Sequence, residues 1–124
     1  MKRILLAIVV MLLSSAAGFA QAPAGFTKLA NTSALTFTDA GCPNLTTCYY
    51  VVTAVDSAGF ESLPAACATN QLCVNGNIAV AQMPSSGTHT VALTWNASTT
   101  TGVTYNAYVH IGPFAPSGIG AKVN

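Results

Sequence analysis

The residues that could do acid–base chemistry in this chain are few and far apart. The only histidines are His89 and His110, and each stands in a strand-like segment far from an acid in sequence. Asp39 and Asp56 fall in turn sequences, where a carboxylate commonly accepts backbone hydrogen bonds, and Glu61 follows the second turn. Nothing in this spacing indicates the paired groups that general acid–base catalysis needs. We therefore predict no catalytic residues, no metal ligands and no cofactor.

Motifs for nucleophilic or phosphate chemistry are also missing from the sequence. It contains no Gly-x-Ser-x-Gly, no phosphate-binding loop and no His-Glu-x-x-His. A small secreted hydrolase would need a cleft with a coupled histidine and acid, and it is kept as the catalytic alternative. Three aromatic residues, Tyr49, Tyr108 and Phe114, could instead be exposed and stack on a sugar or anchor a protein contact. The alternative for all three is ordinary sheet surface or a contact between sheets.

The four cysteines form two pairs with the same spacing, Cys42-x5-Cys48 and Cys67-x5-Cys73. An even number of cysteines in an exported chain favours two disulfides over a zinc site, whose ligands are usually two to four residues apart. The expected hairpin places Cys67 opposite Tyr49 and facing away from Cys48, which favours the two local pairs. A slip of one residue in the register would reverse that preference.

The first twenty residues have the organisation of a secretory signal peptide. Met1, Lys2 and Arg3 form a positive start, Ile4 to Leu13 is an uncharged apolar run, and small residues end at Ala20. Ten apolar residues fall short of the roughly 20 needed to span a bilayer. We expect cleavage after Ala20, and a secreted, periplasmic or cell-surface location.

Removal of this segment leaves very little charge. The charged residues of 21–124 are two lysines, Lys28 and Lys122, and the three acids already named. No basic patch is present for nucleic acid or for an anionic membrane surface, so we expect neither as a partner.

The rest of the chain favours an all-β fold. Threonine and valine are frequent, and the residues that usually cover exposed helix faces are scarce. Alternating or apolar runs bounded by turn residues predict about seven short strands. The expected strands are 25–30, 34–38, 48–55, 60–69, 78–82, 89–95 and 103–111. We expect one two-sheet antiparallel sandwich over 21–124.

Two stretches resemble the fibronectin type III family. Residues 49–62, from Tyr49 to Ser62, resemble the last hairpin of such a domain, strands F and G. Residues 90–98 and 105–108 resemble strands B and C, with Trp95 as the core tryptophan and Tyr105 opening strand C. The resemblance implies an immunoglobulin-like sandwich whose core contains Trp95, Tyr105, Tyr50 and Val52.

The order of these stretches departs from the family, because the F–G hairpin precedes the B–C pair. Lys28 and Lys122 lie in similar short segments at opposite ends, about one repeat apart. The halves 21–70 and 77–124 could form one permuted sandwich, or they could belong to neighbouring domains of a tandem array. Each half alone would expose an apolar face to water, and exposed apolar surface costs about 25 cal/mol of free energy per Å². This cost favours the single sandwich.

A second departure is Cys48, where family members often have a tyrosine. A tyrosine near the start of strand F can fasten the corner between strands E and F in such sandwiches. A Cys42–Cys48 bridge could fasten that corner covalently.

The function implied by the resemblance is a non-catalytic extracellular module that spaces or binds. Its partners would be other extracellular domains, surface proteins or polysaccharide. The alternative is a strand-swapping subunit of a surface fibre, in which residues 25–69 of one copy pair with 78–111 of the next. Asn31, Asn44 and Asn96 also match the N-glycosylation pattern.

Overall fold

The structure is a computed structural model that describes residues 9–10, 23–69 and 71–112, and every regular element in these ranges is a β-strand. All paired strands run antiparallel. The predicted all-β, two-sheet fold class is confirmed. None of the described residues belongs to a helix that could cross a membrane. The strands are β1 (Val9–Val10), β2 (Thr27–Thr32), β3 (Thr36–Asp39), β4 (Thr47–Val55), β5 (Ala66–Cys67), β6 (Cys73–Val74), β7 (Ile78–Gln82), β8 (Val91–Thr94) and β9 (Thr104–Ile111).

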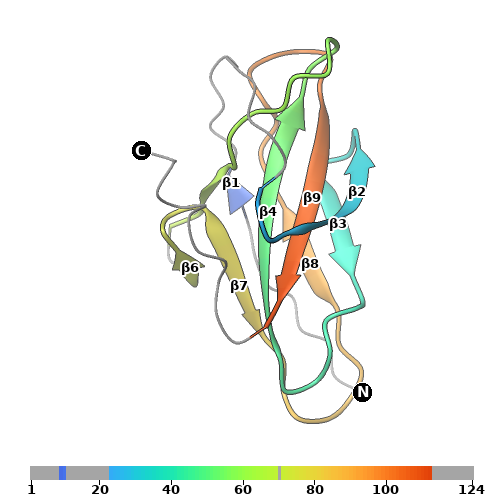
Figure 1. Cartoon of the computed structure of the whole chain (residues 1–124), viewed down its shortest axis with the longest axis vertical. Helices are drawn as coiled ribbons and strands as arrows, with labels where there is room; N and C mark the ends of the chain where they lie inside the picture. The colour runs from blue at the N-terminus through green and yellow to red at the C-terminus, as the bar shows by residue number, and fades with distance from the viewer. Residues whose placement is uncertain (1–8, 11–22, 70, 113–124) are drawn as a thin grey trace.

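The larger sheet has five strands in the order β2-β9-β4-β7-β6. Its centre is β4, which pairs with β9 along nearly its whole length, from Cys48 opposite Ile111 to Val55 opposite Thr104. β4 is buried on both faces along almost all of its length, and its valines and tyrosines suit a pleated backbone packed on both sides. Figure 1 shows β4 and β9 side by side in the middle of the molecule.

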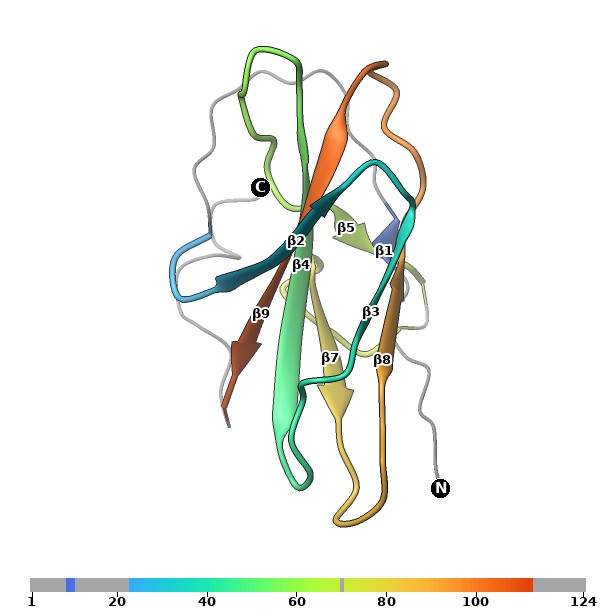
Figure 2. The same cartoon turned by 90° about the vertical axis from the view of Figure 1, so that its right-hand side faces the viewer.

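The smaller layer is the pair β3-β8, which packs on one face of the larger sheet (Figure 2). The core between the layers contains all four residues expected there: Trp95, Tyr105, Tyr50 and Val52. The Trp95 and Tyr105 rings lie with centroids 5.7 Å apart and tilted, an arrangement that aromatic pairs prefer.

Both halves of the chain build these layers. Three strands of the first half pair with strands of the second half. β2 pairs with β9, β3 pairs with β8, and β4 pairs with both β9 and β7. The two halves therefore share one hydrophobic core in this structure.

The strand expected over 60–69 forms only in part. The turn is centred where the sequence indicated, because Val55 bridges Glu61, the Ser62 amide donates to Ala54 O, and the Ala65 amide donates to Val52 O. The chain then leaves β4, and β7 takes the next place, with Ala79 opposite Tyr50. Residues 60–65 therefore lie beside the second half of β4, and β7 lies beside its first half. Residues 66–77 form an insertion between these two segments.

The insertion is closed by its own bonds. Cys67 forms a disulfide with Cys73, and the Cys67 amide donates to Gly76 O. The turn that joins β6 to β7 consists of Asn75, Gly76 and Asn77. Asn75 and Gly76 both have positive φ, and an Asn-Gly pair is typical of tight hairpin turns. No strand was predicted between the expected strands 60–69 and 78–82, so β6 and its hairpin with β7 were not foreseen. On its other side, β5 pairs with β1.

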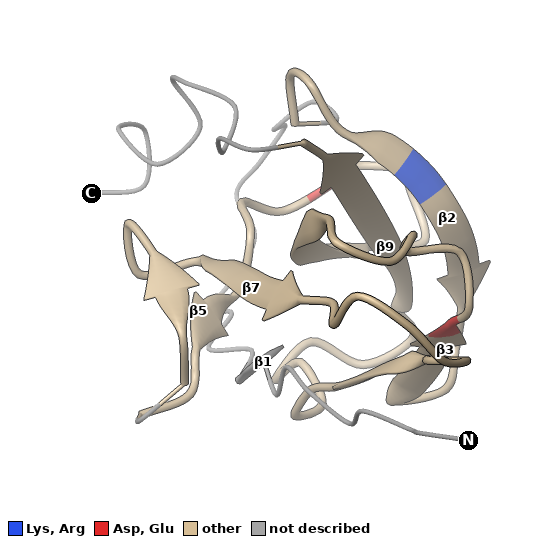
Figure 3. Ribbon diagram, turned by 90° about the horizontal axis from the view of Figure 1, so that it is seen from below, with Lys and Arg blue, Asp and Glu red and all other residues tan. Residues whose placement is uncertain are grey.

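Charge is sparse over the part of the chain that the structure describes. Figure 3 shows the single described lysine, Lys28, on β2, and an acid, Asp39, at the end of β3. With so few charges, the described fold depends on apolar burial and on neutral or carboxylate hydrogen bonds.

Candidate functional site: the outer face of the larger sheet

The larger sheet has a core face and an outer face, set by the alternation of side chains in β4 and β9. Tyr50 and Val52 of β4 point into the core, whereas Tyr49, Val51 and Thr53 lie on the outer face. The apolar part of the outer face is buried as well, and it forms a second cluster made of Tyr49, Val51, Ile78, Val80 and Tyr108, with Phe26 and Val74 packed against it.

Glu61 is the centre of a polar cluster at one end of this face. Its Oε2 accepts hydrogen bonds from the Thr53 and Tyr108 hydroxyls, and from Asn106 Nδ2 at 3.1 Å. Asn106 Nδ2 also lies 3.3 Å from the Tyr108 hydroxyl. Thr53 belongs to β4 and the other two donors to β9, so the cluster joins the edge segment to the sheet centre.

The environment of Tyr108 keeps its hydroxyl protonated. Burial raises the pKa of this phenol, and the hydrogen bond to Glu61 together with the carboxylate charge raises it further. Tyr108 is therefore a hydrogen-bond donor to Glu61, and it is poorly suited to act as a base.

Asn31 extends the cluster to the edge strand β2. Its Nδ2 donates to Asn106 Oδ1 at 2.8 Å and to Thr104 Oγ1 at 3.0 Å. These amides and hydroxyls satisfy one another across three strands. Such mutual satisfaction is characteristic of a structural network, because a binding site normally keeps polar groups free for its ligand.

The opposite end of the outer face is aromatic. His110 packs between Phe26 and Tyr49, with both ring centroids 6.0 Å away, and its Nδ1 lies 2.9 Å from Gly25 O. Tyr49 is 7% exposed and Tyr108 is 2% exposed, so neither is an exposed stacking aromatic, and packing within the fold is the alternative that applies to both. Both lie in the second apolar cluster instead. Phe114 lies outside the described residues.

The other histidine is also used by the fold. His89 is buried, lies before β8 and not within a strand as expected, and its Nε2 is 2.7 Å from Ser86 O. The hydrogen-bond partners of both histidines are backbone carbonyl oxygens, and the described residues contain no group of three potential metal ligands.

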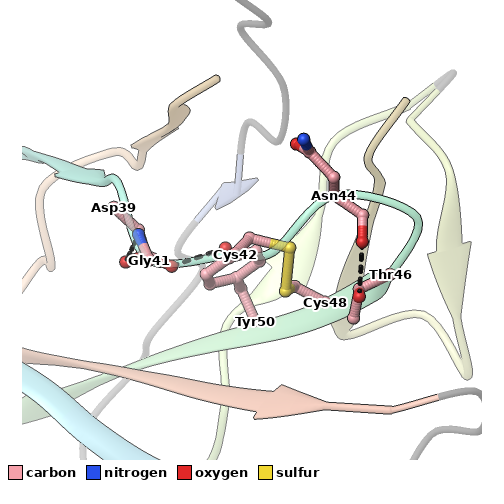
Figure 4. The surroundings of a disulfide bond; sticks show 7 residues. All are labelled: Asp39, Gly41, Cys42, Asn44, Thr46, Cys48 and Tyr50. Carbon is pink, nitrogen blue, oxygen red and sulfur yellow. Dashed lines mark hydrogen bonds between the residues drawn. A yellow bond between two sulfur atoms is a disulfide. The ribbon is translucent and has the colours of Figure 1, made fainter. Parts of the chain in front are cut away.

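Asp39 and Tyr50 form a second buried polar contact, at the corner between β3 and β4. The Tyr50 hydroxyl donates to Asp39 Oδ2 at 2.7 Å, and the Gly41 amide donates to Asp39 Oδ1 at 2.9 Å. Figure 4 shows this contact beside the Cys42–Cys48 disulfide, which closes the same loop. The corner is thus held by the Cys42–Cys48 disulfide and by the hydrogen bond from the Tyr50 hydroxyl. Tyr50 lies two residues after Cys48 in β4.

Both disulfides join the local pairs favoured by the spacing, and no cysteine is free. They differ in environment. Cys42 and Cys48 are buried in the core, whereas Cys67 and Cys73 are half-buried in the insertion.

Comparison with known proteins adds no assignment. No family model, no curated protein and no solved structure matches the chain. The polar cluster around Glu61 was not predicted from the sequence. Asn106 and Tyr108 lie two residues apart in β9 and so share one face, and Thr53 lies on the neighbouring strand β4. The partner that unites them, Glu61, is eight residues from Thr53 but 45 from Asn106, and only the pairing of β4 with β9 brings them together.

Proposed function

We propose that this chain is a non-catalytic secreted module of the fibronectin type III kind, which spaces or binds other extracellular proteins. The observation that carries the proposal is the use of its titratable groups. All three acids of the chain accept hydrogen bonds within the fold: Asp39 from Tyr50, Asp56 from turn amides, and Glu61 from its cluster. Both histidines contact backbone carbonyls. Catalysis would need at least one of these groups to be free for a substrate.

The neighbour relations of the strands support the family. If β4 is strand F, β9 is strand C, and residues 60–65 together with β7 form an interrupted strand G, then the larger sheet contains the order C-F-G of one immunoglobulin-like sheet. The smaller layer, β3 beside β8, then corresponds to E beside B. The neighbours agree although the chain visits the strands in a shifted order.

The second observation concerns the partner class. Tyr49 and Tyr108, two of the aromatics considered for stacking on a sugar, are buried, and the exposed aromatic Phe60 lies near an exposed aliphatic side chain, Leu63. The large apolar side chains that are exposed include Phe60 at 54% and Leu63 at 49%, on either side of Glu61 in the edge segment. Exposed apolar groups beside a sheet edge favour a protein as the partner.

The compartment follows from the predicted signal peptide and from the disulfides. Two disulfides are consistent with an oxidising environment outside the cytosol. The strand-swapping fibre stays the alternative, because it would use the same strand pairs, β2 with β9, β3 with β8 and β4 with β7, between copies of the chain.

The test is to express the tagged full chain in an exporting host and to recover it from outside the cytosol. We expect a mass lacking residues 1–20, no titratable thiol, and a monomer at all concentrations. A panel of ester, glycoside and peptide substrates should show no turnover. Turnover that disappears in the Glu61→Gln or His110→Gln variant would contradict the proposal, as would a protein retained in the cytosol with its thiols free.

A further inference from the structure

The two disulfides differ in their surroundings, although each closes a loop with the same sequence separation of 6. Cys48 is fully buried and Cys42 is 7% exposed, and both belong to the core cluster. Cys67 and Cys73 are half-buried and lie in the insertion 66–77. Because the two loops are equally long, a difference in the reactivity of the two bridges would come from their environment.

The loop between Cys67 and Cys73 is held by long hydrogen bonds. The Gln71 amide donates to Ala68 O, and the Ala68 amide donates to Gln71 Oε1, both at 3.3 Å. The Val80 amide donates to Leu72 O at 3.2 Å. These lengths lie at or beyond the long end of the usual range, where the bonds are weak. Local opening of this loop should therefore cost less free energy than unfolding of the whole protein.

A side-chain amide in the same loop also favours opening. Gln71 Nε2 is buried and has no hydrogen-bond partner among the described residues. A buried donor without a partner destabilises the closed loop, and opening lets water bind that donor. The neighbouring Leu72 is already 56% exposed, so its movement exposes little further apolar surface.

The core does not depend on this second bridge. The core cluster of the described residues contains Cys42 and Cys48 but neither Cys67 nor Cys73. The insertion lies at the margin of the larger sheet, where β6 pairs with β7 alone (Figure 1). Cleavage of the Cys67–Cys73 bond should therefore leave the packing between the two layers intact.

We propose that Cys67–Cys73 is a thiol–disulfide exchange site, which an external thiol opens while the sandwich stays folded. The attacking thiolate forms a new S–S bond with Sγ of one cysteine, and the Cys67–Cys73 bond breaks. The other cysteine leaves as a thiolate and takes a proton from water. This inference goes beyond spacing or binding, because it gives the chain a site of covalent modification.

A second external thiolate completes the reaction. It attacks the external sulfur of the mixed disulfide, and the remaining cysteine leaves and is protonated. Two external thiols are thus oxidised to one disulfide, and the protein bridge is reduced to two thiols. The two protons that the external thiols lose equal the two that Cys67 and Cys73 gain.

The experiment treats the exported, oxidised chain with excess reduced glutathione at pH 8 without denaturant. Free thiols are trapped at intervals with N-ethylmaleimide, and mass spectrometry of proteolytic peptides assigns the label to each cysteine. We expect labelling of Cys67 and Cys73 to be at least about tenfold faster than labelling of Cys42 and Cys48. A glutathione adduct at Cys67 or Cys73 should appear first, and the fluorescence of Trp95 should stay unchanged meanwhile.

The control variant carries Cys67→Ser and Cys73→Ser. It should show a cooperative urea transition and take up no label over the same period. Equal labelling of the two bridges, or earlier labelling of Cys42 and Cys48, overturns the proposal. A change in Trp95 fluorescence that parallels the labelling of Cys67 also overturns it, because the bridge would then open only with global unfolding. A control variant that does not fold has the same meaning, since the sandwich would then depend on this bridge.

Discussion

At the residue scale, two tyrosine hydroxyls bind two carboxylates on opposite faces of the larger sheet. Tyr50 donates to Asp39 on the core side, and Tyr108 donates to Glu61 on the outer side. Burial raises the pKa of Tyr50, and the Asp39 hydrogen bond and charge raise it further, as Glu61 does for Tyr108. Both contacts require a protonated phenol.

The stability of the fold should therefore fall in alkaline solution. A phenol whose pKa is raised on folding stabilises the protein fully below its unfolded pKa of about 10. This stabilisation is lost as the pH rises beyond that value, because the unfolded chain then releases a proton that the folded chain retains. The free energy of unfolding, measured by urea denaturation at pH 8, 10 and 11, should decrease across this range.

The control for this prediction is the double variant Tyr50→Phe and Tyr108→Phe. It should be less stable at pH 8, by about 1–2 kcal/mol for each lost hydrogen bond. Its stability should also change less between pH 8 and 11 than that of the unaltered chain. An identical slope in the two proteins would show that these phenols do not set the alkaline dependence.

At the element scale, the irregular feature is the edge beside β4, which is divided between residues 60–65 and β7. Residues 66–77 leave the sheet between them and carry β5, β6 and one disulfide. Ala65 binds Val52 through its amide, and Ile78 precedes Ala79, which is opposite Tyr50. The two segments thus occupy consecutive positions along β4.

Deletion of residues 66–77 should therefore leave the sandwich folded. Joining Ala65 to Ile78 preserves the alternation, since Ala65 faces the core and Ile78 faces outward. We expect a cooperative urea transition and an unchanged environment of Trp95, measured by its fluorescence. Deletion of residues 47–51 is the matched control and should abolish folding. A molten or unfolded product from the 66–77 deletion would show that the insertion is part of the core structure.

The two disulfides allow a second comparison at this scale, because each closes a loop with the same sequence separation of 6. Loop entropy alone gives about 2 kcal/mol for either bridge. Cys42→Ala with Cys48→Ala should cost more than Cys67→Ala with Cys73→Ala, since only the first pair empties space in the core. We expect a difference of about 1 kcal/mol or more in urea denaturation. Equal losses would contradict a structural role for the buried bridge beyond loop closure.

At the scale of the whole molecule, one core depends on both halves of the chain. β4 lies between β9 and β7, and the core cluster combines side chains from both halves of the chain. The halves should therefore be inseparable in folding.

This dependence is testable with the fragments 21–70 and 77–124. Each alone should lack the near-ultraviolet circular dichroism of packed tyrosine and tryptophan, and an equimolar mixture should recover part of it. The intact chain should unfold in one transition. A fragment that folds alone would favour the reading of two half-domains from neighbouring repeats.

The sequence by itself determined the class of fold and the position of most strands. Alternation and turn residues are local signals, so β4, β8 and β9 were predicted within one or two residues of their ends. The local cysteine spacing likewise favoured the pairs that form, and the Asp56–Gly59 turn occurs where its residues indicated. Each of these features is decided within about ten residues of chain.

The tertiary structure decided what depends on distant partners. Residues 66–69 continue the local strand pattern, but β7 competes for the edge of β4 and displaces them, and no local signal reports that competition. The burial of Tyr49 and Tyr108 and the gathering of donors around Glu61 arise only when β9 lies beside β4.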